Sequence, residues 1–443
     1  MSTVRDPGGS EDGLAHALPP REAIAAAFLA PEAPLVAGLV GKAQVSAVDA
    51  RSIGERATAL VEAVRAGRGN HGGIDAFLNE YGLTSEEGVI LMCLAEALLR
   101  IPDAETADAL IAEKIGGGQW ERHLGHSESL LVNASTWGLM LTGHIVRLGR
   151  NRDGGALGLV KRMVARTGEP VIRQAVRQAM RILGDQFVLG RTIEEALKRA
   201  DAFEAKGYRF SYDMLGEGAR TEPDAMRYLD KYRAAIEAVG RHAGAPPADM
   251  QLERLMERPG LSVKLSAIHP RFEASQGDRL EAQLVPRVVE LVQLARARGL
   301  SVTVDAEEQE RLEATLDVFA RVLLAPEFAG WPGLGLAVQA YGRRALPVLA
   351  WLERLSAVAR KPIPVRLVKG AYWDSEIKWA QERGLASYPV FTEKLHTDVS
   401  YLAAMRFLLA RPHAFYPQLA THNAHTVAAV SGPGAGHAFE YPR

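Results

Sequence analysis

The stretch PVRLVKGAYWD, residues 364–374, decides how the second half of this chain folds. Its apolar residues lie between a proline and a glycine, which is the pattern of a short buried strand. Arg366 and Lys369 interrupt that strand with two positive charges, and an unpaired charge is costly to bury. We therefore expect both cations to face an anionic or electron-rich group, with Tyr372 and Trp373 directly beside them.

Five further short apolar runs accompany this stretch, and each is followed by a longer helical pattern. They are residues 208–215, 261–268, 300–308, 333–341 and 417–423. Buried strands that alternate with helices predict a parallel sheet. Because each run ends in polar residues, six such units fit a (β/α) barrel over residues 207–443 better than an open sheet. No G-x-G-x-x-G follows the first strand, which argues against a Rossmann domain.

The first half of the chain has a different texture. Residues 1–20 are rich in glycine, proline, serine and aspartate, which predicts a disordered tail. Residues 21–200 have a helical pattern. The segment 85–102 begins with Ser-Glu-Glu and stops at a proline, and 169–187 repeats this logic. We expect an all-α domain here.

Composition excludes several classes of protein. The net charge is -1, from 52 basic and 53 acidic residues, so no DNA binding is expected. Cys93 is the one cysteine, which excludes an intrachain disulfide and a cysteine zinc cluster. The N-terminus has no signal-peptide pattern, and no run reaches about twenty apolar residues. We expect a cytoplasmic protein and leave peripheral membrane contact open.

Polar side chains gather where the predicted strands end, and in a barrel those ends share one face. Lys264 lies inside an apolar run, so its charge needs a carboxylate, for which Glu217 and Asp305 are the candidates. Such a pair suits a zwitterionic or carboxylate substrate. The residues at or just past the strand ends are Asp213, Glu217, Lys264, Asp305, Gln339, Lys369, Tyr372, His422 and Asn423.

Some nearby polar residues have structural explanations. Glu307 and Glu308 are expected to begin the next helix, where acids favour the positive end of the dipole. His269 is expected to stabilise the turn before a proline, and His425 to lie in the first turn of a helix.

Two cations and a glycine precede two aromatic residues in this stretch: Arg366, Lys369 and Gly370, then Tyr372 and Trp373. This combination indicates a ligand with phosphates and a flat ring. The glycine would let such a ligand approach the backbone closely. Flavin adenine dinucleotide (FAD) has both features, and a cation beside the flavin favours its reduced form. A structural salt-bridge network under an aromatic lid is the alternative.

A divalent-metal barrel enzyme is a second alternative, with ligands from four residues whose types suit such an ion. Lys264 and Arg366 would repel the cation and argue against it. The four candidate ligands are Glu217, Asp305, His269 and His422.

The motifs RFSYDMLGEGART, GLSVKLSAIHPRFE, VTVDAEE, VRLVKGAYWDSEIKWAQERGL and LATHNAHTVAAV resemble the proline dehydrogenase domain of proline utilization A. The stretch SEEGVILMCLAEALLRIPDAETADALIAEKI resembles the helical domain that precedes it. The resemblance runs from about residue 75 to the C-terminus. It implies a distorted (βα)8 barrel that binds FAD non-covalently and oxidises L-proline to Δ1-pyrroline-5-carboxylate by hydride transfer to flavin N5. This is the first step of proline catabolism to glutamate.

The resemblance also implies roles for single residues. Lys264 would contact the proline carboxylate, Glu217 would join an ion-pair network over the substrate, and Asp305 would lie at the flavin and substrate pocket. Tyr372 would pack at the pocket wall. The general base that removes the amine proton of proline could be either solvent or Asp305, and the sequence leaves both candidates open. FAD would be lined by Gln339, Arg366, Lys369, Gly370, Ala371, Tyr372, Trp373, Thr392, Lys394, Thr421, His422 and Asn423.

The partners implied are L-proline and a membrane quinone that accepts the electrons, and a homo-oligomer stays open. Residues 439–443 correspond to the family's seventh strand, and 431–443 hold one arginine in place of the later pair that clamps the proline carboxylate. We therefore expect a C-terminally truncated chain with weakened FAD binding and very low proline turnover. An inactive remnant that acts as an oligomerisation or regulatory module is the alternative.

Overall fold

The computed structural model describes residues 18–67, 188–216, 218–431 and 439–441. The chain divides into two compact units, Met1–Leu60 with Phe203–Arg443, and Val61–Ala202. Helix α4 (Ala47–Gly67) leads from the first unit into the second, and α11 (Ile193–Glu204) leads back. The predicted helices at 85–102 and 169–187 lie outside the described residues, as does Glu217.

In the described part of the chain, six parallel strands form one sheet in which the order of the strands follows the order of the sequence. Each strand overlaps the apolar run that predicted it, so the expected α/β architecture is confirmed. The strands are β1 (Ser211–Asp213), β2 (Gly260–Val263), β3 (Ser301–Val304), β4 (Leu334–Gln339), β5 (Ile363–Val368) and β6 (Phe415–Leu419).

The chain returns to this sheet beside β6. Glu440 forms a parallel bridge with Gln418, and its backbone exchanges hydrogen bonds with Leu419 at 2.7 Å and Pro417 at 3.0 Å. Residues 439–441 therefore occupy the seventh strand position, where the family resemblance placed them.

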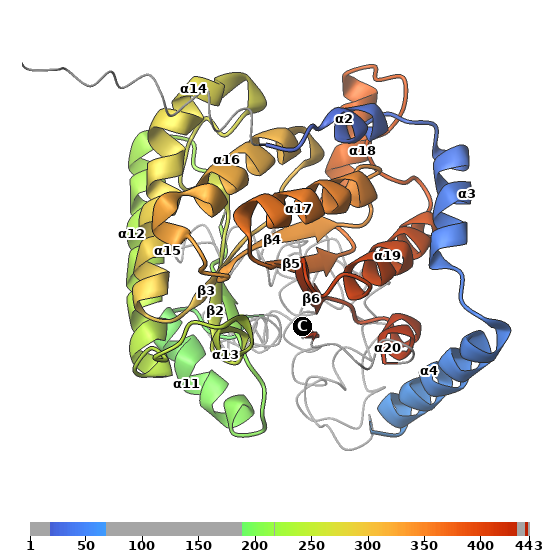
Figure 1. The fold of residues 1–443 in the computed structure, drawn as a ribbon, viewed down its shortest axis with the longest axis horizontal. Coiled ribbons are helices and arrows are strands. Elements are labelled where there is room, and N and C mark those ends of the chain that lie inside the picture. The colour runs from blue at the N-terminus through green and yellow to red at the C-terminus, as the bar shows by residue number, and fades with distance from the viewer. Residues whose placement is uncertain (1–17, 68–187, 217, 432–438, 442–443) are drawn as a thin grey trace, which may run out of the picture. The chain divides into compact units, whose positions relative to one another are not determined.

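Helices connect the strands and lie around the sheet, as Figure 1 shows. Because β2 and β4 are buried along their whole length, the sheet has the apolar character of a parallel barrel wall. Within the described residues, no helix is long and apolar enough to cross a membrane. The helices are α12 (Glu222–Ala243), α13 (Leu252–Met256), α14 (Gly277–Arg279), α15 (Val285–Ala297), α16 (Leu312–Leu324), α17 (Ala345–Ala359), α18 (Trp373–Glu382), α19 (Lys394–Leu409) and α20 (Ala424–Val430).

Helix α12 shows how local sequence sets an element that supports the site. Thr221 and Asp224 cap its start reciprocally, since each side chain accepts a hydrogen bond from the other's backbone N–H. Its buried face includes Leu229, Tyr232 and Ile236, spaced three and four residues apart. Tyr232 thereby points its hydroxyl towards the end of β2.

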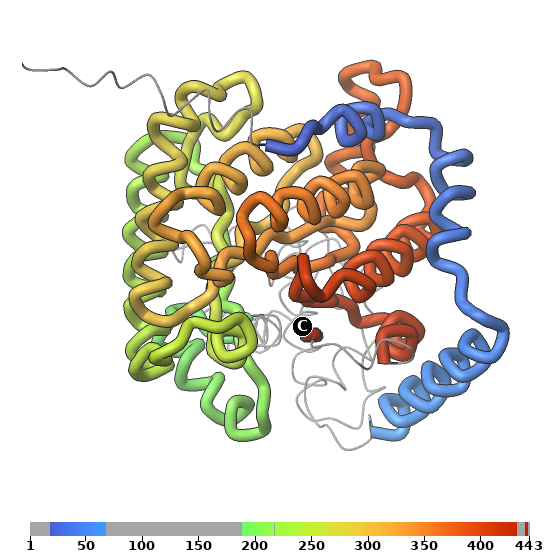
Figure 2. The backbone as a smooth tube through the Cα atoms, in the orientation of Figure 1, coloured from blue at the N-terminus to red at the C-terminus, as the bar shows by residue number. Residues whose placement is uncertain are grey.

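The N-terminal arm, residues 18–60, belongs to the same unit as the barrel. Its helices α2 (Glu22–Ala27) and α3 (Glu32–Ala43) run along the outside of α17 and α19 (Figure 2). Leu39 of α3 packs in one apolar cluster with Phe391 and Ala403. The sequence grouped this arm with the helical domain at 21–200, whereas the structure joins it to the sheet that follows some 150 residues later.

The residues before α2 are also held in place. The indole Nε1 of Trp351 in α17 donates a 2.9 Å hydrogen bond to the carbonyl of Pro19, and Arg354 donates to Pro20 at 3.1 Å. Arg21 stacks on the Trp351 ring at 4.5 Å. The predicted disordered tail of 1–20 is therefore corrected for residues 18–20, because the indole and guanidinium donors of α17 bind their carbonyls.

Replacing Gly335 by alanine tests the packing of β4 on β5. A Cβ at Gly335 would lie 2.7 Å from the carbonyl oxygen of Pro364, so the strands would have to separate. We expect Gly335→Ala to lower the free energy of unfolding by about 1–3 kcal/mol, measured by urea denaturation. Gly277→Ala is the control, since nothing lies within 4 Å of its added Cβ. Equal stability of the two variants would contradict this packing.

Candidate functional site

Lys264 is the centre of an ion-pair network at the carboxyl ends of β1, β2 and β3. Its Nζ donates to both carboxylate oxygens of Asp213, at 2.9 and 3.0 Å, and to Asp305 at 2.8 Å. Of the two partners predicted from sequence, Asp305 pairs with Lys264. Asp213 is the second partner, which the sequence placed at a strand end but did not name as a partner of Lys264. The available signal was its position at the end of β1, next to the strand that carries Lys264.

The electrostatics of this network favour an ionised ammonium. Burial alone would lower the pKa of Lys264, but Asp305 and Asp213 outweigh it and raise that pKa. Loss of solvent and the nearby Asp305 carboxylate raise the pKa of Asp213, against the effect of Lys264. The hydroxyl of Tyr232 accepts a 3.1 Å hydrogen bond from the Lys264 N–H and so fixes its backbone. Asp213 keeps 45% of its side-chain surface exposed, which leaves this end of the network open to a ligand.

The structure shows which groups surround the charge of Arg366. Its side chain leaves β5 and reaches the hydroxyls of Ser262 at 2.6 Å, Ser211 at 2.7 Å and Thr303 at 3.3 Å, which belong to β2, β1 and β3. It also lies 3.5 Å from Asp305. The guanidinium is therefore surrounded by small hydroxyl residues on three other strands. Their oxygens accept its hydrogen bonds, which offsets the cost of burying the charge.

Lys369, the first residue after β5, has a carboxylate and an aromatic ring as partners. Its Nζ forms an ion pair with Asp398 of α19 and lies 5.9 Å from the centre of the Tyr401 ring. Asp398 also accepts a 2.9 Å bond from Lys394. Lys369 and Lys394, which were both predicted to line the cofactor, thus share the carboxylate of Asp398. These three side chains together carry a net positive charge.

The structure gives Gly370 a reason that the sequence did not reveal. This glycine has φ +140°, and a Cβ on it would lie 2.4 Å from the ring of Tyr341. Glycine is required here because the Tyr341 ring fills the space that a side chain would need. The close approach of a ligand to this backbone stays a prediction.

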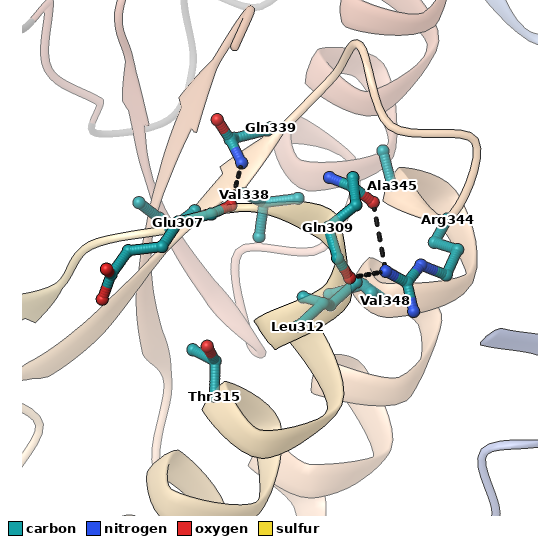
Figure 3. Close-up of a pocket in the computed structure, with 11 residues that line it drawn as sticks. Glu307, Gln309, Leu312, Thr315, Val338, Gln339, Arg344, Ala345 and Val348 are labelled. Atoms are coloured by element: carbon teal, nitrogen blue, oxygen red, sulfur yellow. Dashed lines mark hydrogen bonds between the residues drawn. The ribbon is translucent and has the colours of Figure 1, made fainter. Parts of the chain in front are cut away.

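Gln339 fixes the turn after β5. Its amide Nε2 donates to the carbonyl of Glu307 at 2.9 Å (Figure 3), and its Oε1 accepts from the N–H of Ala371 at 3.2 Å. The Glu307 carboxylate accepts from the N–H of Ser266 at 3.0 Å and from Arg311 at 3.1 Å. Buried Glu307 thus connects the loops after β2 and β3 at the site face, which is the face formed by the carboxyl ends of the strands. The sequence predicted instead that Glu307 would begin the next helix.

Helix α18 places the two aromatic residues. Tyr372 precedes its first residue, Trp373, whose indole donates to the carbonyl of Phe391 at 2.9 Å. In its first turn, buried Glu376 accepts a 2.6 Å hydrogen bond from the N–H of Gln309. Burial raises the pKa of Glu376 to about 7, despite that hydrogen bond.

The remaining predicted residues divide between two places. Thr392 binds Glu32 of the arm, through both its N–H and its hydroxyl. After β6, Asn423 caps α20 by accepting from Thr426 at 3.0 Å, and its own N–H donates to the hydroxyl of Thr421 at 3.1 Å. The Asn423 side-chain oxygen thus has a structural partner. His422 between them is exposed, and His425 lies in the first turn of α20 as expected.

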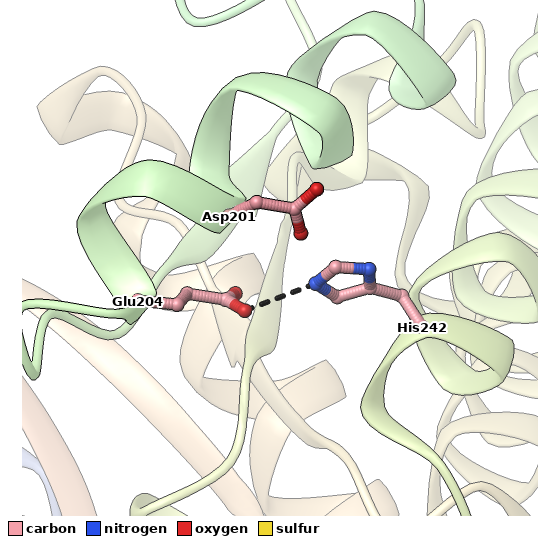
Figure 4. A group of neighbouring side chains, drawn as sticks. All are labelled: Asp201, Glu204 and His242. Carbon is pink, nitrogen blue, oxygen red and sulfur yellow. Dashed lines mark hydrogen bonds and ion pairs between the residues drawn. The ribbon is translucent and has the colours of Figure 1, made fainter.

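The residues of the metal alternative do not gather into a metal cluster in the described part of the chain. Asp305 binds Lys264, and His269 is buried between Gln283, at 3.2 Å, and the N–H of Arg271, at 3.2 Å. A different pair lies apart from the site face, where His242 Nε2 and Glu204 Oε2 are 3.0 Å apart (Figure 4).

The site fits an anionic cofactor with a flat ring system. Within the described residues, the Nε of Arg366 is buried and has no hydrogen-bond partner, although it is a strong donor. The pair of lysines on Asp398 retains a positive charge that suits phosphate. Trp373, the first residue of α18, keeps 42% of its surface exposed.

Comparison with known proteins gives three family matches. Residues 196–434 match proline dehydrogenase, and residues 19–65 match the N-terminal domain of the proline utilization A proline dehydrogenase. Residues 73–187 match a domain described as the DNA-binding domain of proline dehydrogenase. That description names DNA binding, which differs from our expectation that no DNA binding is involved. A net charge near zero does not reveal how charge is distributed among domains.

Individual relatives agree with these matches. The chain is 47% identical over 413 residues to the bifunctional protein PutA of Salmonella typhimurium, covering 93% of this chain and 31% of that protein. It is 28% identical over 238 residues to proline dehydrogenase 1 of Bacillus subtilis subsp. natto, covering 54% of this chain and 64% of that protein. The chain thus spans about a third of the length of the PutA relatives.

A crystal structure of a Bradyrhizobium japonicum proline utilization A variant resembles this fold. It superposes with a TM-score of 0.66 at 44% identity, covering 96% of this chain and 41% of that one. At this identity the likeness extends beyond the fold to much of the sequence.

Glu376 predicts a specific pH dependence of stability. Because its pKa is raised from 4.5 to about 7 in the folded chain, its stabilising proton is lost as pH rises through this range. Glu376→Gln should therefore gain stability relative to the unmodified chain between pH 5 and pH 8. The expected gain is about 2–3 kcal/mol, at about 1.4 kcal/mol per pKa unit. Urea denaturation at both pH values measures it.

Glu382→Gln is the control, because it replaces an exposed acid on the same helix by the same amide. A Glu376→Gln difference that stays constant with pH would contradict the raised pKa.

Proposed function

The chain belongs to the proline dehydrogenase family, and from this and the site geometry we propose that it oxidises L-proline to Δ1-pyrroline-5-carboxylate with FAD. The observation that carries the proposal is the group of Lys264, Arg366, Asp213 and Asp305 at the carboxyl end of the sheet. Two cations and two carboxylates sum to zero. Such a group can bind both charges of a zwitterionic amino acid. Its cations can bind the substrate carboxylate, and its carboxylates can bind the substrate ammonium.

The roles in substrate binding follow from charge. Lys264 attracts the carboxylate of proline, and Asp213 and Asp305 attract its amine. Since Lys264 already donates three hydrogen bonds, a bound carboxylate replaces one of the Asp213 contacts. Asp213 is the partly exposed member, so its contacts can be exchanged at the least cost in buried structure.

FAD, when bound, supplies a two-electron acceptor at N5 for the hydride on C5 of proline. Arg366 contributes a free Nε donor and a positive charge that stabilises electron-rich ligand atoms. Lys369 and Lys394 contribute the positive charge for phosphates. Gln339 keeps the backbone of Ala371 in place.

The amine proton of proline must leave before the hydride does, because the nitrogen lone pair forms the new C5=N bond. The carboxylates of Asp213 and Asp305 lie on the site face and can accept hydrogen bonds, and then a proton, from the amine of proline. The pKa of Asp213 is raised by loss of solvent and by Asp305, which favours proton acceptance there. Its partial exposure gives water access to carry the proton away.

The electron acceptor that returns FAD to its oxidised form is proposed to be a quinone at a membrane surface. This part rests on the family resemblance alone. Reduction of a water-soluble quinone by the chain in the presence of L-proline tests it, and turnover that continues only with oxygen would overturn it.

Lys264 gives the sharpest test of the enzymatic proposal. We expect the purified chain to bind FAD weakly and to show flavin absorption that bleaches slowly when L-proline is added without oxygen, and D-proline to leave that absorption unchanged. Lys264→Met should keep the flavin but slow bleaching by about 100-fold, because the substrate carboxylate loses its positioning charge. Stopped-flow absorbance measures the rate.

Lys378→Met is the matched control, since Lys378 is a solvent-facing lysine on α18 that pairs with Glu382 at 3.7 Å. The proposal fails if the chain binds no flavin, or if Lys264→Met bleaches as fast as the control.

A further inference from the structure

The arm places Glu32, the first residue of α3, against the segment 389–396 that precedes and begins α19. Its Oε1 accepts from the N–H of Thr392 at 3.0 Å and lies 2.6 Å from Nδ1 of His396. Its Oε2 accepts from the Thr392 hydroxyl at 3.0 Å and from Arg343 at 2.9 Å. One carboxylate therefore makes four polar contacts, three of them to a single short segment.

Arg343 anchors the same place from the barrel side. Its side chain is 1% exposed and donates to the carbonyl of Ala30 at 2.6 Å and to the hydroxyl of Ser387 at 2.7 Å, in addition to Glu32. Its backbone N–H donates to Pro389 at 3.1 Å. The segment is thus attached to the loop after β4 on one side and to the arm on the other.

The held segment carries residues of the cofactor site. Thr392 and Lys394 lie in it, and Lys394 shares Asp398 with Lys369. The carbonyl of Phe391 in the same segment accepts the indole N–H of Trp373. A shift of this segment would therefore displace the side chains that we assign to phosphate and to the flat ring.

We propose that Glu32 is a positioning residue for the cofactor, acting from an element 360 residues earlier in the chain than Thr392. It does not touch the reacting atoms. Its carboxylate orders the backbone and side chain of Thr392, and with them the lysine two residues later. This inference rests on the proposed function, because it assumes that FAD binds at this face.

A purely structural role makes a different prediction. If Glu32 only stabilised the fold, its replacement would lower the midpoint of urea unfolding and leave the FAD affinity of the folded chain unchanged. A positioning role requires weaker FAD binding in a chain that is still folded, and faster local opening of the segment.

The test uses the full chain without cofactor, as Glu32→Gln and Glu32→Ala. Amide hydrogen exchange of residues 387–397 reports on the segment itself, and quenching of flavin fluorescence reports the dissociation constant of FAD. We expect the Thr392 amide to exchange faster in both variants. The dissociation constant should rise by about tenfold for Glu32→Ala and by less for Glu32→Gln, which keeps one acceptor oxygen.

Glu22→Gln is the matched control, an exposed acid in the first turn of α2 on the same arm, and it should change neither quantity. His396→Phe removes one of the four contacts without altering Arg343 or Thr392. It serves in place of Glu32→Ala if that variant does not fold, with a smaller expected rise.

The inference is overturned if Glu32→Gln and His396→Phe bind FAD as tightly as the unmodified chain and exchange Thr392 no faster. If the unmodified chain takes up no FAD at all, the proposed function fails. The exchange comparison then decides by itself whether Glu32 holds the segment.

Discussion

The structure depends on how it neutralises two cations of the parallel sheet, Arg366 inside β5 and Lys264 directly after β2. A barrel wall of short apolar strands offers them no solvent, so each must find acceptors on other strands. Arg366 binds hydroxyls on β1, β2 and β3, and Lys264 binds the carboxylates of the last residue of β1 and of the residue after β3. These contacts connect strands that are far apart in sequence and place their polar ends at one face.

A second layer of polar contacts holds the loops around that face. Gln339 joins the loop after β3 to the turn after β5, and Glu307 joins the same loop to the residues after β2. Both side chains are buried, so breaking either contact leaves an unsatisfied polar group. The candidate site is therefore positioned by glutamine and glutamate residues that need not touch a ligand.

The sequence predicted the strands, their parallel order and the acid partner Asp305, because strand and helix periodicities and the cost of a buried charge are local properties. It did not predict that Tyr341 would occupy the space beside Gly370, or that Asp398 would bind both Lys369 and Lys394. Those contacts arise between elements whose separation only the folded chain sets. The arm is the largest such case, since nothing local to residues 18–43 indicates that they pack on α17 and α19.

The central claim is that the carboxyl face of this sheet binds FAD beside Arg366. A crystal structure of the chain grown with FAD tests it most directly. The account predicts density for the flavin ring at the ends of β4, β5 and β6, with the Nε of Arg366 now bonded to the cofactor and the Lys264 network beside it. Density for FAD elsewhere, with Arg366 still bonded only to its three hydroxyls and Asp305, would contradict the account.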